Sequence, residues 1–289
     1  MVEVLISAQE LHRRLAAAAD GRGPLVLDVR WALGDPHGRE HHLARRIPGS
    51  VYVDLNADLA APAEPARGRH PLPSPEDFQT AARRWGLRSG QGVVVLDDNG
   101  GMAAARAWWL LRWAGLEDVR LLDGGLRAWA EAGYGLHGEQ DPVASPEPGD
   151  VELGSGRMPT VDTDAAAAFP GHGVLLDARA GERYRGENEP VDPRAGHVPG
   201  ALNAPTGENL RKDGRFKDAD ELRARFAALG ANAEAGDAGA VAVYCGSGVT
   251  AAHEIAALAV AGVPAALYPG SWSQWSNDPL RPAATGREA

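Results

Sequence analysis

Short apolar runs alternate along this chain with longer stretches in which apolar residues recur every three or four positions. An apolar run without polar alternation is typical of a strand that is covered on both faces of a parallel sheet. Such runs predict strands at 25–29, 93–97, 119–122, 174–178, 240–244 and 265–268. The helical periodicity predicts helices at 7–19, 75–86, 102–114, 163–169, 219–228 and 250–261. This alternation predicts an α/β fold of open, mainly parallel sheets flanked by helices.

The start of the chain has the features of a helix rather than of a targeting segment. Ser7 stands three residues before Glu10, which is the spacing of a capping box. A secretory signal would show a basic start, an apolar stretch and a small-residue cleavage site, and the first residues do not show this order. We therefore expect the protein in the reducing cytoplasm.

The sequence contains an internal repeat. Four segments recur in the same order at a separation of about 150 residues, which is the size of a domain and not of a solenoid repeat. The matched pairs are 25–30 with 174–179, 47–50 with 198–201, 93–96 with 241–244, and 122–126 with 268–272. A stretch rich in Pro, Gly and acidic residues separates the copies. We predict a first domain at 1–140, a linker at 141–158 and a second domain at 159–289.

Composition removes several classes of protein. The net charge of the 289 residues is -10, which argues against a nucleic-acid or anionic-membrane partner. No window of about 18 apolar residues exists, so we expect no membrane span. The single cysteine, Cys245, excludes an internal disulfide framework and a thiolate metal cluster within one chain. We expect neither a metal nor an organic cofactor.

The chemistry is concentrated around Cys245. The apolar strand 240–244 leads into Cys-Gly-Ser-Gly-Val-Thr, and a helix is predicted from Thr250. Open α/β sheets bind ligands at this carboxyl end of a strand. Gly246 and Gly248 allow the backbone to curl so that its N–H groups form an anion cradle, which would stabilise a thiolate or a persulfide. The alternative is a buried cysteine that acts only as a small apolar side chain.

The loop Cys-Gly-Ser-Gly-Val-Thr resembles the active-site loop of rhodanese-like sulfurtransferases, in its mercaptopyruvate sulfurtransferase form. The resemblance extends over both halves and includes the segments 177–179, 183–186, 196–201 and 270–275. It implies tandem rhodanese-like domains with a catalytic second half. An ungapped alignment of the two loops places Asp97 at the position of Cys245. Because a carboxylate cannot accept sulfane sulfur, the first half is expected to be catalytically silent.

The resemblance also implies roles for individual residues. Cys245 is expected to attack the donor sulfur and become a persulfide, which a thiol, cyanide or sulfite then discharges. Arg183 and Arg194 are expected to bind the anionic end of the donor. The remaining substrate-binding positions are Gly246, Gly248, Val249 and Thr250. Ser247, His70 and Asp54 are expected to form a catalytic group that helps the donor thiol to lose its proton.

The choice of donor follows from charge. Thiosulfate-type loops carry basic residues directly after the cysteine, whereas Gly246 and Ser247 are neutral here. This favours 3-mercaptopyruvate, whose one carboxylate Arg183 could hold, and thiosulfate remains the alternative. We expect the partners to be a small anionic sulfur donor and a thiol acceptor, either a thioredoxin-like protein or a small thiol.

Other functions fit less well. A cysteine phosphatase needs an arginine that closes the loop, and Ala251 stands at that position. A serine hydrolase built on Ser247 needs a glycine where Cys245 stands. A non-catalytic sulfur carrier or a regulatory binding module remains possible, because one half has already lost its cysteine.

Overall fold

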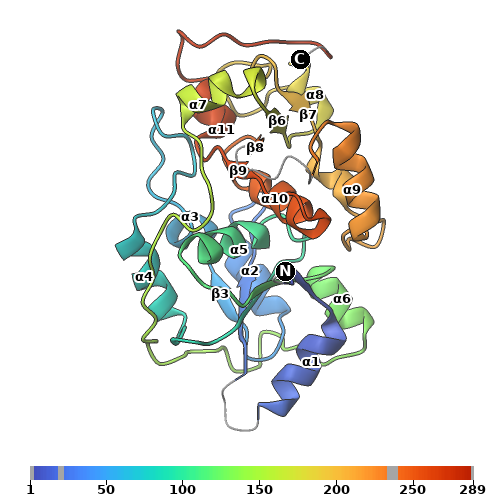
Figure 1. Ribbon diagram of the computed structural model, residues 1–289. Coiled ribbons are helices and arrows are strands. Elements are labelled where there is room, and N and C mark those ends of the chain that lie inside the picture. The colour runs from blue at the N-terminus through green and yellow to red at the C-terminus, as the bar shows by residue number, and fades with distance from the viewer. Residues whose placement is uncertain (1–2, 19–22, 233–239, 288–289) are drawn as a thin grey trace. The chain divides into compact units, whose positions relative to one another are not determined.

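The computed structural model describes residues 3–18, 23–232 and 240–287, and the chain divides into two compact units (Figure 1). Unit 1 comprises Met1–Leu59, Pro73–Arg157 and Lys212–Arg215. Unit 2 comprises Ala60–Leu72, Met158–Arg211 and Phe216–Ala289. The division differs from the domain boundaries predicted from the sequence mainly at Ala60–Leu72, which comes from the first half of the chain but belongs to unit 2.

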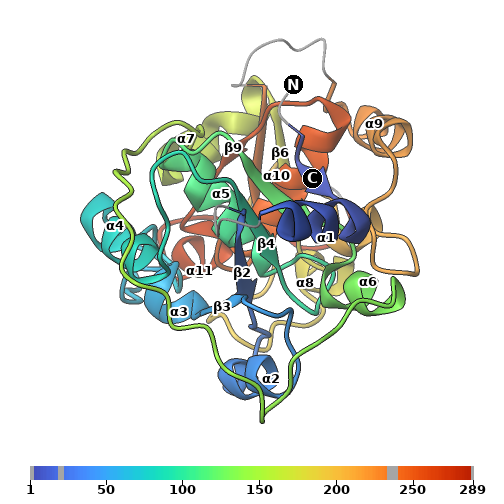
Figure 2. The same ribbon diagram turned by 90° about the horizontal axis from the view of Figure 1, so that it is seen from below.

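Unit 1 contains a five-stranded parallel sheet in the order β1-β5-β4-β2-β3. Its strands are β1 (Leu5–Ile6), β2 (Leu25–Val29), β3 (Val51–Val53), β4 (Val93–Leu96) and β5 (Val119–Leu122). Its helices are α1 (Ala8–Ala17), α2 (Gly38–Ala44), α3 (Leu55–Asp58), α4 (Pro75–Arg84), α5 (Ala104–Trp113) and α6 (Gly125–Glu131). Helices α1 and α6 pack together over the sheet (Figure 2) and share a core with Val94 and Leu96, which lie on one face of β4.

Unit 2 contains a four-stranded parallel sheet in the order β7-β6-β8-β9. Its strands are β6 (Val174–Asp177), β7 (Leu202–Asn203), β8 (Val241–Tyr244) and β9 (Ala266–Leu267). Its helices are α7 (Thr163–Ala168), α8 (Gly181–Tyr184), α9 (Ala219–Ala228), α10 (Thr250–Ala261) and α11 (Ser271–Trp275), with short 3-10 turns η1 (Phe169–Gly171) and η2 (Thr206–Asn209). The order β5-β4-β2-β3 in unit 1 corresponds to β9-β8-β6-β7 here, so the duplication predicted from the sequence is present in the topology.

The predicted elements form, and their ends agree with the prediction or differ from it by at most two residues. The elements not predicted are short, with two to seven residues each: β1, β3, β7, α2, α3, α6, α8 and α11. Half of the predicted capping box is present, because the Ser7 hydroxyl accepts the N–H of Glu10 at 3.1 Å while the Glu10 carboxylate binds Arg13 and Arg14. Within the described ranges, no helix has the length and apolar character needed to cross a membrane.

The backbone of the predicted linker is hydrogen-bonded to helices of unit 1. Gly149 donates its N–H to the carbonyl of Arg83 at 2.7 Å, and Arg157 donates to the carbonyl of Trp113 at 3.0 Å. A Cβ on Gly149 would lie 1.9 Å from the carbonyl oxygen of Leu87, so only glycine fits there. The segment up to Arg157 is therefore an extended strap on unit 1, bound along α4 and α5.

Candidate active site

Cys245 lies between the end of β8 and the start of α10 (Figure 1) and is 1% exposed. Its thiol sulfur accepts the backbone N–H of Gly248 at 3.1 Å. Gly248 has a φ of 78°, in the left-handed region that glycine adopts without steric cost. Val249 follows as the N-cap of α10, and Thr250 is the first residue of the helix. The sequence thus places the thiol in a curled loop that leads into a helix N-terminus.

The start of α11 holds this loop in place. The Ser271 hydroxyl accepts the N–H of Cys245 at 3.1 Å and donates to the carbonyl of Tyr268 at 2.9 Å. Trp272 and Ser273 donate their N–H groups to the carbonyls of Cys245 and Gly246, at 3.0 and 2.9 Å. Ser271 has a φ of 53°, and non-glycine residues in this region are found preferentially at functional sites. The backbone around the thiol is therefore fixed on both sides of the cysteine.

The predicted serine and histidine lie together in unit 2. The Oγ of Ser247 is 2.8 Å from Nδ1 of His70, although the residues are 177 positions apart in the sequence. Both are nearly buried, with 6% and 9% of their surface exposed. The segment Ala60–Leu72 carries His70 to this place. A hydrogen-bonded serine and histidine can relay a proton, provided that the histidine is in its neutral form.

Asp54, the third predicted member of this group, caps α3 in unit 1. Its Oδ1 accepts the N–H groups of Asn56 and Ala57 at 2.9 and 3.0 Å. These bonds give the carboxylate a structural task. Its role beside His70 stays a prediction, since the two residues belong to different units.

Two guanidinium groups stand next to the residue that follows Cys245. A Cβ built on Gly246 would lie 3.1 Å from Nη2 of Arg69 and 3.4 Å from Nη1 of Arg183. Arg183 was predicted from the sequence, whereas Arg69 was not. Its signal was its position directly before His70, on the segment that supplies the histidine.

Two carboxylates bind these arginines. Arg183 donates to both oxygens of Glu189, at 2.6 and 3.2 Å, and to Oδ2 of Asp192 at 3.3 Å. Arg69 donates to Oδ1 of the same Asp192. Burial raises the pKa of Asp192 above its usual value, although Arg69 and Arg183 oppose this. Burial acts in the same direction on Glu189, but Arg183 and the N–H groups of the following turn hold its pKa below the usual value.

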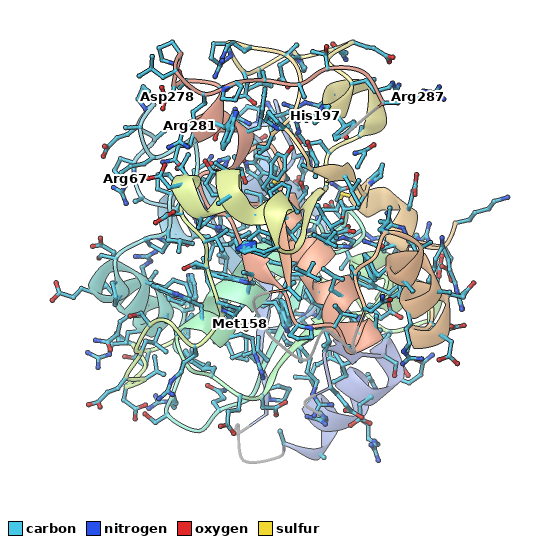
Figure 3. All side chains as sticks on the ribbon, turned by 45° about the horizontal axis from the view of Figure 1, so that its top comes forward. Arg67, Met158, His197, Asp278, Arg281 and Arg287 are labelled. Carbon is cyan, nitrogen blue, oxygen red and sulfur yellow. The ribbon has the colours of Figure 1, made fainter. Side chains whose placement is uncertain are left out.

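Arg194 binds the backbone that follows α11. Its Nε and Nη atoms donate to four backbone carbonyls at 2.6–2.9 Å. The acceptors belong to Trp275, Ser276, Asp278 and Arg281, of which the last two are labelled in Figure 3. Four of its five N–H donors are thus used by the backbone after α11. These bonds anchor the segment after α11, and the role of Arg194 in binding the donor stays a prediction.

The corresponding loop of unit 1 is already filled by the side chain of Asp97. Asp97 follows β4 and is 1% exposed. Its Oδ1 accepts the N–H groups of Asn99 and Gly101 at 2.9 and 2.8 Å, and its Oδ2 those of Ala103 and Ala104 at 2.9 and 3.0 Å. The amides that could receive a ligand bind the loop's own carboxylate instead.

Several buried polar residues of the two units make structural contacts. Asp28 pairs with Arg30, and Asp177 with Arg179, each at 2.6 Å and buried. His197, labelled in Figure 3, donates its Nδ1–H to the carbonyl of Tyr184 at 2.8 Å and is fully buried. In the described part of the chain, no group of three or more His, Cys, Asp or Glu side chains could hold a metal ion.

Comparison with known proteins assigns the family. The profile of the Rhodanese-like domain matches residues 7–132 and again 162–278. The chain belongs to the rhodanese family. A Pseudomonas aeruginosa protein named for 3-mercaptopyruvate sulfurtransferase activity is 46% identical over 98% of this chain and 98% of its own. A Mycobacterium tuberculosis protein named for thiosulfate sulfurtransferase activity, SseB, is 45% identical with the same coverage.

The fold agrees with this assignment. The crystal structure of SseA from Escherichia coli, a 3-mercaptopyruvate sulfotransferase, superposes with a TM-score of 0.79 at 33% identity. It covers 93% of this chain and 99% of SseA. The tandem rhodanese fold predicted from the sequence is confirmed, and the chain is a sulfurtransferase. The names of the relatives differ in the donor, so the donor is a separate question.

Proposed function

We propose that this sulfurtransferase takes sulfur from 3-mercaptopyruvate onto Cys245 and passes it to a thiol. The observation that carries the choice of donor is the 2.8 Å contact between Oγ of Ser247 and Nδ1 of His70. Ser247 stands two residues after the nucleophile, Cys245. 3-Mercaptopyruvate brings a thiol proton that must leave its sulfur, whereas thiosulfate brings none. A proton relay at this position therefore has a task with the first donor only.

In the first half-reaction, the Cys245 thiolate attacks the sulfur of HS–CH2–CO–COO⁻. The S–S bond forms as the C–S bond breaks, and its electron pair leaves with carbon as the enolate of pyruvate. The sulfur proton passes to the Ser247–His70 pair, and the enolate carbon takes up a proton. The products are pyruvate and the Cys245 persulfide anion, so atoms and charge balance. The Gly248 N–H, 3.1 Å from the sulfur of Cys245, supports the anionic forms of this side chain.

In the second half-reaction, an acceptor thiolate attacks the outer sulfur and leaves Cys245 as a thiolate. Cyanide would form thiocyanate and sulfite would form thiosulfate in the same way. We propose a thioredoxin-like protein or a small thiol as the acceptor in the cytoplasm, where the single free cysteine would stay reduced.

Arg183 is the proposed ligand of the donor carboxylate. It stands beside Gly246 and is partly exposed, at 17% of its side chain. Glu189 and Asp192 bind its Nε and Nη2 atoms, so Nη1, the atom nearest Gly246, is the donor proposed to bind the carboxylate by a charge-assisted hydrogen bond. We also propose that Asp54 supports His70, and this part of the proposal rests on the family resemblance alone.

The test measures kcat/KM for both donors in the wild type and in Ser247→Ala. We expect the wild type to prefer 3-mercaptopyruvate by more than tenfold. Loss of the hydroxyl should lower kcat with 3-mercaptopyruvate by about 10²-fold and leave thiosulfate nearly unchanged. A wild type that prefers thiosulfate by more than tenfold would contradict the donor assignment. A protein that is charged on Cys245 but never turns over would be a carrier.

A further inference from the structure

The arginines beside Cys245 are electrically balanced. Arg69 and Arg183 bring two positive charges to the edge of Gly246, Asp192 binds both arginines, and Glu189 binds Arg183. The two guanidinium groups beside Gly246 are therefore nearly neutralised by two carboxylates. The preference of the site among anions depends on these carboxylates as much as on the arginines.

The two carboxylates differ in what else they hold. Glu189 accepts the N–H groups of Val191 and Asp192, both at 3.1 Å, so it shapes the backbone turn that follows α8. The two oxygens of Asp192 instead contact one guanidinium each, Oδ1 that of Arg69 and Oδ2 that of Arg183. Its side chain is 2% exposed. Asp192 is thus a buried carboxylate that bridges the two cations nearest the residue after the nucleophile.

Burial makes this charge effective. Water screens the Asp192 carboxylate poorly, so its field reaches the position where a donor anion would lie beside Gly246. The repulsion that a bound anion experiences grows with the charge of that anion. A dianion is penalised about twice as much as a monoanion by the same carboxylate.

We propose that Asp192 is a specificity-determining residue, which offsets the charge of Arg69 and Arg183 so that the site selects a monoanionic sulfur donor over a dianionic one. The inference deepens the proposed function, since it explains how the choice between 3-mercaptopyruvate and thiosulfate is made. It also gives Arg69 a role, as the second cation whose charge Asp192 controls.

The test is the ratio of kcat/KM for thiosulfate to that for 3-mercaptopyruvate in Asp192→Asn. Asparagine keeps the shape and one hydrogen-bond acceptor but removes the charge. We expect the ratio to rise at least tenfold over the wild type, mainly through KM for thiosulfate, and the gain to shrink as salt is added. An unchanged ratio in a folded, persulfide-forming variant overturns the proposal.

Two further variants separate charge from structure. Asp192→Glu keeps the charge, and we expect its ratio to stay within about threefold of the wild type. Asp220→Asn makes the same change of net charge at a side chain that is 90% exposed on α9, and we expect no change of ratio. If Asp192→Asn and Asp192→Glu both lose activity equally with both donors, Asp192 is only structural and the proposal fails.

The outcome is independent of the donor assignment. The wild-type preference alone tests whether 3-mercaptopyruvate is the donor. The shift of the ratio between wild type and variant tests Asp192, whichever donor the wild type prefers.

Discussion

The loop after β4 in unit 1 and the loop after β8 in unit 2 occupy equivalent positions in their sheets but carry different side chains at the first residue. Strand β4 pairs with β2, and β8 pairs with the equivalent strand β6. In unit 1, four backbone N–H groups bind the carboxylate of Asp97. In unit 2, the aligned residue is Cys245, and its sulfur accepts the N–H of Gly248.

The difference separates what the backbone does from what the side chain does. A strand, a glycine-containing loop and a helix make an anion-binding cradle from main-chain groups alone. A carboxylate fills that cradle permanently and turns it into a structural element. A thiol is neutral, so the negative charge in this loop arises only during the reaction, when the side chain becomes a thiolate or a persulfide. We therefore expect the duplicated loop to serve stability in unit 1 and chemistry in unit 2.

The largest expected effect is at the reactive position of unit 2. Cys245→Ser should lower sulfur transfer from either donor by at least about 10³-fold, because a hydroxyl is a poor nucleophile towards sulfur and forms no persulfide. Steady-state assays with both donors measure this. Residual turnover near the wild-type level would mean that Cys245 is not the residue that carries the sulfur.

The next effect is a loss of stability in unit 1 with activity retained. Asp97→Ala leaves four N–H groups without their acceptor, three of them buried, and we expect a loss of about 3 kcal/mol in the free energy of unfolding. Denaturant unfolding measures the stability, and the two-donor assay under native conditions measures the activity. If stability is unchanged, Asp97 does not fill the cradle. If kcat falls tenfold in a folded variant, the two loops do not have separate tasks.

Arg183 and Arg194 sharpen the comparison within unit 2. Arg183→Met should raise KM for 3-mercaptopyruvate by about 10- to 100-fold, the loss expected for a charge-assisted pair. Arg194→Met should lower the melting temperature, because it removes four bonds to backbone carbonyls, and leave KM unchanged. Kinetics and thermal unfolding of both variants distinguish the roles. A raised KM in a stable Arg194→Met protein would restore the sequence prediction.

The smallest effect is at Gly246. An added methyl group would come within 3.1 and 3.4 Å of the two guanidinium groups, whose flexible ends can move by a few tenths of an ångström. Gly246→Ala should therefore raise KM a few-fold with kcat nearly unchanged. A collapse of kcat would show that the backbone at Gly246, and not the arginines, is the critical contact.

Short sequence motifs were enough to predict the strand, the loop and the helix around Cys245. Cys245, Ser247 and the helix from Thr250 follow one another along the chain, so their geometry is set by short-range rules. The pairing of β8 with its neighbours follows from the apolar runs and the repeat. These parts of the fold and of the site could be inferred before any coordinates existed.

Long-range packing could not be inferred in the same way. Arg69 reaches the site because Ala60–Leu72 packs within unit 2, held where the Arg69 N–H meets the Ser273 hydroxyl at 3.0 Å. Gly68 allows this approach, since a Cβ there would lie 2.7 Å from the carbonyl of Gly270. Arg194 is bound by carbonyls about 80 residues later in the chain. Neither contact leaves a periodic signal in the sequence.

The most direct measurement is the intact mass of the protein after treatment with 3-mercaptopyruvate. Because Cys245 is the only cysteine, a gain of one sulfur atom needs no further mapping beyond its absence in Cys245→Ser. The account predicts this gain, one pyruvate released for each sulfur bound, and discharge of the sulfur by cyanide or a thiol. Pyruvate release without any sulfur on the protein, or a charged Cys245→Ser variant, would contradict it.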